Sequence, residues 1–241
     1  MPLSLDFSPN TIECVLQSLE ARKALMDFDT LGRTLAYSPF MPRVERSFFV
    51  RESGNAPKIA QRLFIESATF CADSLSYIHR AYALEEQMET LGHFEAYMLD
   101  LSEGMSNVDT LSSPLESIAL LRRHSTLPII HSDIFLEEYQ ILESALFGAD
   151  TILIPAQPLS GKSLTKLLSF ARRLSFEPFI GVQNKDELKK AIFSGASMLF
   201  IPQDTFAELL SLVPNTQVIA TDCADEYGVD LWIQSKNVEV K

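Results

Sequence analysis

From Arg62 onward the chain alternates short apolar runs with longer segments in which apolar residues recur at helical spacing. Short runs that are apolar on both faces are typical of parallel strands buried beneath helices. We expect strands at 62–66, 97–101, 128–131, 151–155, 178–182, 198–202, 217–221 and 230–233. The helical spacing predicts helices near 74–91, 114–124, 138–147, 161–174, 185–194 and 204–212.

Eight strands alternating with helices predict an α/β fold, a (β/α)8 TIM barrel. The alternative is an open, doubly wound sheet, but the chain has no glycine-rich turn of the dinucleotide-binding type. Gly148 and Gly195 each stand between a helix and a strand, where glycine suits a left-handed helix end. At 241 residues and 46% apolar, the chain is large enough for such a barrel as one structural domain.

The first part of the chain has a different pattern. Residues 9–26 form an apolar stripe that Ser8 or Asn10 can cap, which predicts a helix. Residues 37–58 are interrupted by proline and glycine, with a turn expected around Gly54. We therefore predict that residues 1–58 are an N-terminal helical extension packed on the barrel, and that residues 59–241 form the barrel itself.

The strand–helix alternation breaks down near the C-terminus. Residues 224–229, which lie between the last two expected strands, are too few for a crossover helix. We therefore expect the last two barrel helices to be missing or vestigial. The apolar surface left there would need a cover, either the N-terminal segment or a homodimer or protein partner.

Composition narrows the function. A net charge of −12 without a basic stripe argues against nucleic-acid binding. Three cysteines without paired spacing fit a reducing cytoplasm and predict neither a disulfide nor a zinc site. No apolar run is long enough to span a membrane. We expect a cytoplasmic protein with no cofactor and no resident metal.

The segment 127–155 carries a specific pattern: Asp133, the run Tyr139-Gln140-Ile141 with Glu143, and Gly148-Ala149-Asp150. Residues 179–196 add Phe179-Ile180-Gly181-Val182, Glu187-Leu188, Ala191 and Gly195-Ala196. With this spacing the chain resembles the indole-3-glycerol-phosphate synthase family of tryptophan biosynthesis, over roughly residues 60–235. The resemblance implies a carbon–carbon lyase that closes an indole ring on a carboxyphenylamino-deoxyribulose phosphate, with loss of carbon dioxide and water.

In that family, a lysine protonates the substrate carbonyl, and a glutamate and a second lysine assist the dehydration. The resemblance puts the third-strand lysine on Ser132, next to a retained Asp133. The remaining family positions fall on residues of other types: the first-strand lysine on Glu66, the fifth-strand glutamate and histidine on Gly181 and Gln183, the sixth-strand asparagine and arginine on Pro202 and Asp204, the seventh-strand Glu-Ser-Gly on Thr221, Asp222 and Cys223, and the eighth-strand Gly-Ser on Gln234 and Ser235.

These replacements predict that the synthase activity is lost or very weak, because losing one general acid or base typically costs ~10² to 10⁴ in rate. Two alternatives stay open: a different small-molecule enzyme using the acidic barrel mouth, or a non-catalytic binding or interaction barrel. The expected ligand is a phosphorylated small molecule. The candidate catalytic residues are Asp133, Glu66, Ser132 and His131, and the candidate ligand-binding residues are Gln183, Asp204, Asp222 and Ser235.

Two further motifs have structural explanations. A ring of carboxylates at the strand ends is conceivable as a site for a hard divalent cation, although loop carboxylates more often cap the following helix. The run Ser160-Gly161-Lys162-Ser163 resembles the end of a phosphate loop, but it lacks that motif's first glycine. We expect Ser160 to be a helix cap instead.

Overall fold

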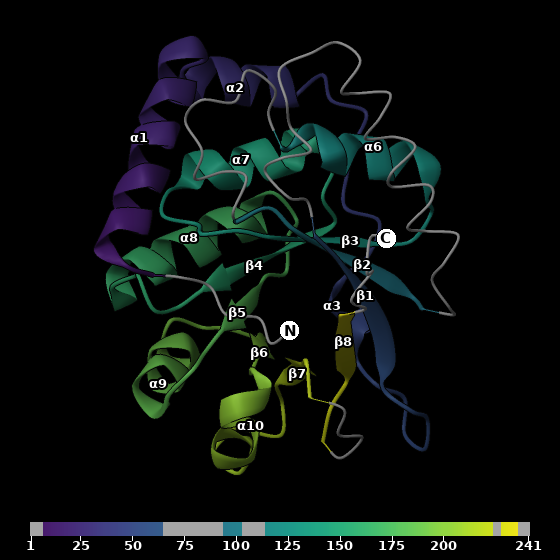
Figure 1. Cartoon of the computed structure of the whole chain (residues 1–241). Helices are drawn as coiled ribbons and strands as arrows, with labels where there is room; N and C mark the ends of the chain where they lie inside the picture. Colours follow the sequence, from purple (N-terminus) through teal and green to yellow (C-terminus); the bar gives the residue numbers. More distant parts are fainter. Residues whose placement is uncertain (1–6, 65–93, 103–113, 224–227, 236–241) are drawn as a thin grey trace, which may run out of the picture.

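Eight parallel strands form a closed barrel in the computed structural model, which describes residues 7–64, 94–102, 114–223 and 228–235 (Figure 1). Each strand pairs with the next in the sequence, and the last pairs with the first. The strands are β1 (Lys58–Phe64), β2 (Ala96–Asp100), β3 (Ile129–Ser132), β4 (Thr151–Pro155), β5 (Phe179–Gly181), β6 (Met198–Phe200), β7 (Val218–Thr221) and β8 (Leu231–Ser235). The (β/α)8 prediction is confirmed, and pairing of β8 with β1 excludes the open sheet.

Helices surround the barrel and precede it. The helices before the first strand are α1 (Pro9–Leu25), α2 (Phe28–Leu35) and α3 (Arg46–Phe49). Those between strands are α6 (Glu116–His124), α7 (Glu138–Phe147), α8 (Gly161–Arg173), α9 (Lys185–Phe193) and α10 (Gln203–Leu210). Ser160 caps α8, since its hydroxyl accepts from the Ser163 backbone N–H, as expected. Gly148 ends α7 with a φ of +93°, the left-handed geometry expected there.

Inward-facing side chains from alternate strand positions fill the barrel near the strand starts. Ala60, Ile130, Phe179 and Val218 belong to this inner cluster. The short helix α3 adds Phe49, which is fully buried and meets the Phe179 ring edge-on, with centroids 5.1 Å apart. The amino-terminal end of the barrel is thus closed by apolar packing, so the carboxyl end is where a site is expected.

The helices α1 and α2 pack against α7 on the outside of the barrel. Leu19 and Leu31 form a buried cluster with Tyr139 and Leu142 of α7. The Tyr139 hydroxyl also donates to the backbone carbonyl of Met26, at 2.8 Å. The extension is therefore attached through both apolar and polar contacts.

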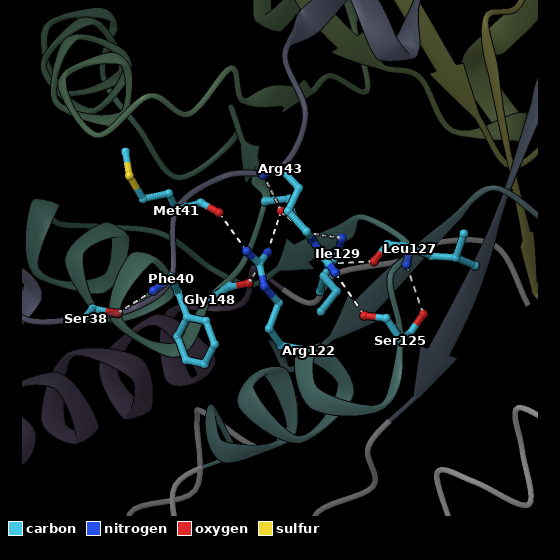
Figure 2. Close-up of polar contacts among 10 residues, drawn as sticks. Ser38, Phe40, Met41, Arg43, Arg122, Ser125, Leu127, Ile129 and Gly148 are labelled. Carbon is cyan, nitrogen blue, oxygen red and sulfur yellow. Dashed lines mark hydrogen bonds and ion pairs between the residues drawn. The ribbon is translucent and has the colours of Figure 1, made fainter.

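The chain between α2 and α3 is fixed to the barrel by a buried carboxylate. Asp150, whose side chain is fully buried, accepts from the Arg43 guanidinium at 2.6 Å and from Arg122 at 2.6 Å. Arg43 also donates to the Ser125 and Leu127 carbonyls, in contacts drawn in Figure 2. Two arginines on one buried carboxylate balance the cost of removing its charge from water.

Most element bounds lie within two residues of those expected, but β1 does not. It begins at Lys58 and ends at Phe64, so the expected strand 62–66 was shifted by four residues at its start. The strand was misplaced because two of its interior residues, Gln61 and Arg62, are polar, whereas we expected apolar residues there. The helices α2 and α3 were not expected, and the predicted helix 74–91 lies outside the described residues.

The connection from β7 to β8 is short. It consists of residues 222–230, and those of them that the structure describes form no helix. Among the helices of the described ranges, none is long and apolar enough to cross a membrane. The division into an extension and a barrel at residue 58 stays a prediction, with the first strand beginning at Lys58 itself.

Candidate active site at the barrel mouth

An ion pair lies inside the barrel at the carboxyl ends of β1 and β2. Arg62 and Asp100 are both about 95% buried, and the Arg62 guanidinium contacts the Asp100 carboxylate at 2.5 Å. The other Asp100 oxygen accepts from the Ser102 hydroxyl at 2.7 Å. Because strand side chains alternate in direction, Arg62 lies on the same inner face as Ala60 of the core. The charge of this arginine is therefore compensated within the barrel.

Ser132 occupies the next inward position. It pairs in register with Asp100 on one side and with Leu153 on the other. Its side chain is fully buried, and its hydroxyl has no hydrogen-bond partner in the structure. The position that the family resemblance gives to a cationic acid thus carries a buried, neutral hydroxyl group.

The opposite side of the mouth is mainly apolar. A small cavity of about 20 Å³ is bounded mainly by Leu153, Pro155, Phe200 and Pro202, with Phe7 as a further wall. The polar side chains that also line it are Gln157, Gln183 and Glu187. Gly181 also lines it, and a Cβ there would lie 3.5 Å from the Leu153 side chain, so a larger residue would take up part of the space. The mouth therefore has a polar half on β1 to β3 and a mainly apolar half on β4 to β6.

Asp133 lies directly after β3 and is fully buried. One of its oxygens accepts from the Ile134 backbone N–H at 2.7 Å, and the other has no hydrogen-bond partner in the structure. Burial raises the pKa of Asp133 to about 6, opposed by the backbone hydrogen bond and by the positive charge of Arg22. A carboxyl group in this range exchanges its proton near neutral pH.

His131 requires a correction. We expected it at the mouth, but it points outward from β3, toward α7: its Nδ1 lies 2.8 Å from the Ser144 hydroxyl, and its ring meets Phe135 edge-on. The Ser144 hydroxyl donates to the Gln140 carbonyl. Nδ1 of His131 is then the donor to Ser144. Burial lowers the pKa of His131 to about 3, so the ring is neutral at physiological pH and has a structural role.

The predicted ligand-binding residues lie apart from one another. Gln183 borders the small cavity, whereas Asp204 is exposed in the first turn of α10. Asp222 accepts from the Gln203 backbone N–H at 2.7 Å, at the start of the same helix. Ser235 pairs in register with Arg62, and its buried hydroxyl has no hydrogen-bond partner in the structure.

Only part of the predicted site therefore comes together. Ser132 and Ser235 lie beside the Arg62–Asp100 pair through strand register, while Glu66 lies outside the described residues. Asp133, the next residue after Ser132, accepts from the Ile134 backbone N–H and interacts with the charges of Arg22 and Asp100. Within the described ranges, no group of three or more His, Cys, Asp or Glu side chains is arranged to hold a metal ion. The carboxylates of Asp100 and Asp222 are instead engaged by an arginine and by a helix start.

Sequence reasoning missed the role of Arg62. The shift of β1 hid it, because the register we expected made residue 62 the first of its strand. A signal was present: Arg62 and Asp100 each follow, by two residues, a small or apolar residue of their own strand, Ala60 and Met98. Opposite charges at inward positions of neighbouring strands indicate an internal ion pair.

Comparison with known proteins agrees with this picture of the scaffold. The family model described as indole-3-glycerol phosphate synthase matches residues 77–219, more than half of the chain. The chain belongs to this family. The indole-3-glycerol phosphate synthase of Campylobacter jejuni (strain 81-176) is 29% identical over 216 residues, covering 86% of this chain and 80% of the relative. The protein of the same name from Sulfurimonas denitrificans is 29% identical, covering 83% and 77%.

Solved structures support the fold alone. A mutant tryptophan synthase alpha-subunit from Pyrococcus furiosus superposes with a TM-score of 0.54 at 15% identity, covering 75% of this chain and 87% of that one. KGPDC from Streptococcus mutans gives a TM-score of 0.52 at 9% identity, covering 75% and 88%. The indole-3-glycerol phosphate synthase family is thus shown from sequence, and the barrel from both sequence and structure.

Proposed function

We propose that this member of the indole-3-glycerol phosphate synthase family does not close the indole ring at its relatives' rate, and that it binds a small molecule at the barrel mouth. The supporting observation is Ser132. It is fully buried beside Asp100, at the position where the resemblance places the lysine that protonates the substrate carbonyl. The pKa of a serine hydroxyl lies far above neutral pH, so Ser132 is no substitute for a cationic acid.

The neighbouring groups do not replace the missing acid. The guanidinium of Arg62 is paired with Asp100, and arginine keeps its proton throughout the physiological range. Gly181 stands at the expected position of the fifth-strand glutamate and has no side chain to offer. When several groups that act together are lost, what remains is substrate positioning.

A second candidate function rests on Asp133. A buried carboxyl group with a pKa of about 6 is suited to general acid–base chemistry near neutral pH. In this case the barrel mouth would support a different reaction on a small molecule. A screen of metabolites by mass spectrometry tests this candidate: turnover that is lost in D133N and kept in S169A, a change at an exposed serine of α8, supports it.

The direct test of the main proposal is a steady-state assay with the carboxyphenylamino-deoxyribulose phosphate, following indole fluorescence. The matched control is the Campylobacter jejuni relative under the same conditions. We expect a rate at least ~10⁴ below the control, from the loss of more than one acid–base group. A rate within tenfold of the control contradicts the proposal.

A further inference from the structure

The outer side of β3 meets α7 and α1 in a layer that contains charged and polar groups. His131 points outward from β3, and Asp133, two residues further on, shares that direction because strand side chains alternate. Glu143 and Ser144 are neighbours on α7, and Ser144 contacts His131. Arg22 of α1 reaches the same place and donates to Glu143 at 2.9 Å. Groups from three elements therefore meet between the barrel wall and the extension.

Four residues of this layer form what we call the outer cluster. Each has one buried polar atom with no hydrogen-bond partner among the described residues: Arg22 Nη2, His131 Nε2, Asp133 Oδ2 and Glu143 Oε2. Arg22 interacts electrostatically with each of the other three side chains, so the four groups gather around one guanidinium. Buried polar atoms in native proteins are nearly always paired, with protein or with ordered water. Four such atoms in one place indicate a bound group that pairs with them.

The hydrogen-bonding character of the four atoms indicates which group this is. Arg22 Nη2 is a donor, and His131 Nε2 is an acceptor, because the ring proton is on Nδ1 and goes to Ser144. With Asp133 and Glu143 both ionised, the outer cluster has three acceptors and one donor. With Glu143 protonated, it has two of each. A water molecule donates twice and accepts twice, so it then satisfies all four atoms.

Charge balance favours the same proton. Arg22 contributes one positive charge, and His131 is neutral because burial lowers its pKa to about 3. Two ionised carboxylates would leave the outer cluster with an uncompensated negative charge, whereas one protonated carboxyl group makes it neutral. The Ile134 backbone N–H bonds to Asp133 and favours its ionised form. The proton therefore belongs on Glu143, whose pKa is raised to about 7 by burial and, to a smaller extent, by the charge of Asp133.

Other charged groups around the outer cluster have partners of their own. Asp100 of β2 interacts with Asp133, but it is paired with Arg62. On α2, Asp27 caps its own helix by accepting from Thr30. Three cations of the surrounding helices contact other carboxylates: Lys23 of α1 with Glu137, Arg122 of α6 with Asp150, and Lys166 of α8 with Glu138. Arg22 is thus the cation that balances the outer cluster.

We propose that the outer cluster is a buried site for one water molecule and one exchangeable proton, with the water held by all four side chains and the proton carried by Glu143. The proton is taken up from solvent and returned to it, so the site is neutral with the proton bound and singly negative without it. Asp133 directly follows Ser132, and the state of the site therefore changes the charge next to the barrel mouth. The inference is independent of the proposed function, since it holds whether or not the mouth binds a ligand.

A crystal structure of the whole chain, grown at about pH 6 and at a resolution that shows ordered water, tests the bound molecule. We expect one water molecule within hydrogen-bonding distance of Arg22 Nη2 and of at least two of the other three atoms. Direct pairing of the four atoms with one another overturns the water site. So does a water that reaches fewer than three of them, or no ordered water beside them.

A carbon-13 NMR titration of the glutamate carboxyl groups tests the proton, and the signal lost in E143Q is that of Glu143. We expect its midpoint near pH 7 in the unmodified chain, and lower by about one pH unit in D133N, because asparagine removes the neighbouring negative charge. D186N, at an exposed aspartate of α9, is the matched control and should leave the midpoint unchanged. Equal midpoints in D133N and D186N overturn the inference, as does a midpoint near 4.5 in the unmodified chain. If D133N does not fold, this last midpoint and the crystal structure still decide it.

Discussion

Arg22 of α1 and Glu143 of α7, 121 residues apart, form a buried charged contact: the arginine Nε donates to the glutamate Oε1 at 2.9 Å. Another nitrogen of the Arg22 guanidinium, Nη1, donates to the Ser18 hydroxyl of the same helix at 2.6 Å. The Glu143 side chain is 7% exposed and that of Arg22 is 17% exposed. Breaking this contact leaves the Glu143 carboxyl group buried between α1 and α7 without an opposite charge beside it.

The first prediction concerns this contact. R22M keeps the length of the side chain but removes its charge, and we expect it to lower the free energy of unfolding by about 2 kcal/mol at pH 8. The control is K185M, which removes the cation of the exposed pair with Glu208 and should cost less than about 0.5 kcal/mol. Urea denaturation measures both. Equal effects of the two changes would show that burial adds nothing to the Arg22–Glu143 contact.

The second prediction is a pH dependence. Burial raises the pKa of Glu143 from 4.5 to about 7, against the opposing charge of Arg22. The folded protein therefore holds this proton more tightly than the unfolded chain. The stability that Glu143 contributes is fully present below about pH 4.5 and is lost as the pH rises through about 7.

E143Q isolates this contribution because glutamine does not titrate. We expect the stability of E143Q relative to the unmodified chain to rise steadily from about pH 5 to about pH 7 and to level off above that. Urea denaturation at a series of pH values gives the difference. A difference that stays constant over this range, or that changes in the opposite direction, contradicts the raised pKa of Glu143.

The third prediction concerns the anchor of the linker before α3. Asp150 accepts from two arginines and from the Ile129 backbone N–H at 2.8 Å. D150A leaves both guanidinium groups without their carboxylate, and we expect a loss of about 3–5 kcal/mol. E208A, at the exposed partner of Lys185, is the control and should change stability by less than about 0.5 kcal/mol. A small loss in D150A would mean that the linker is held by its backbone contacts alone.

The fourth prediction separates backbone strain from steric crowding. Gly148 and Gly54 have similar positive φ values, +93° and +88°. A Cβ on Gly148 would lie 2.9 Å from the Phe40 ring, whereas a Cβ on Gly54 meets nothing within 4 Å. G54A should cost about 1 kcal/mol from the backbone alone, and G148A at least about 1 kcal/mol more. If thermal unfolding shows equal shifts in Tm for the two variants, the Phe40 ring moves aside at no measurable cost in stability, which contradicts the prediction.

The fifth prediction concerns the position of Ser132. S132K places a lysine where the family resemblance has one, but Gly181 has no carboxylate and Asp100 is already paired with Arg62. Groups that act together do not recover singly. We expect the rate of ring closure in S132K to stay within tenfold of that of the unmodified chain. A hundredfold gain would show that Ser132 alone limits the reaction.

The sequence predicted those helices and strands whose bounds depend on neighbouring residues of the chain. The strand Thr151–Pro155 and the helix Glu138–Phe147 have the bounds expected, because a continuous apolar run, a capping box and Gly148 define them. The first strand was misplaced because the stability of Arg62 inside the barrel comes from Asp100, 38 residues away. The pattern within one strand does not report such a partner; only a comparison of neighbouring strands does. The helix Phe28–Leu35 was missed despite a signal, since Asp27 caps it and Leu31 and Leu35 follow at helical spacing.

The site was predictable to a smaller extent. Ser132 and its neighbours follow from the strand register of β3, which the sequence pattern defined well. The outward direction of His131 depends on which face of β3 meets α7, and a shift of one residue reverses that face. The mainly apolar half of the mouth includes Phe7, whose position beside Leu153 arises only in three dimensions.

The measurement that tests the central claim most directly is a single-turnover experiment. The chain, in excess over the carboxyphenylamino-deoxyribulose phosphate, is mixed with it, and indole fluorescence is followed beside the Campylobacter jejuni relative. Excess protein removes product release and weak binding as explanations. We predict no indole product from this chain in the time that the relative needs for full conversion. Full conversion by both proteins would contradict the claim that Ser132 has taken the place of the acid.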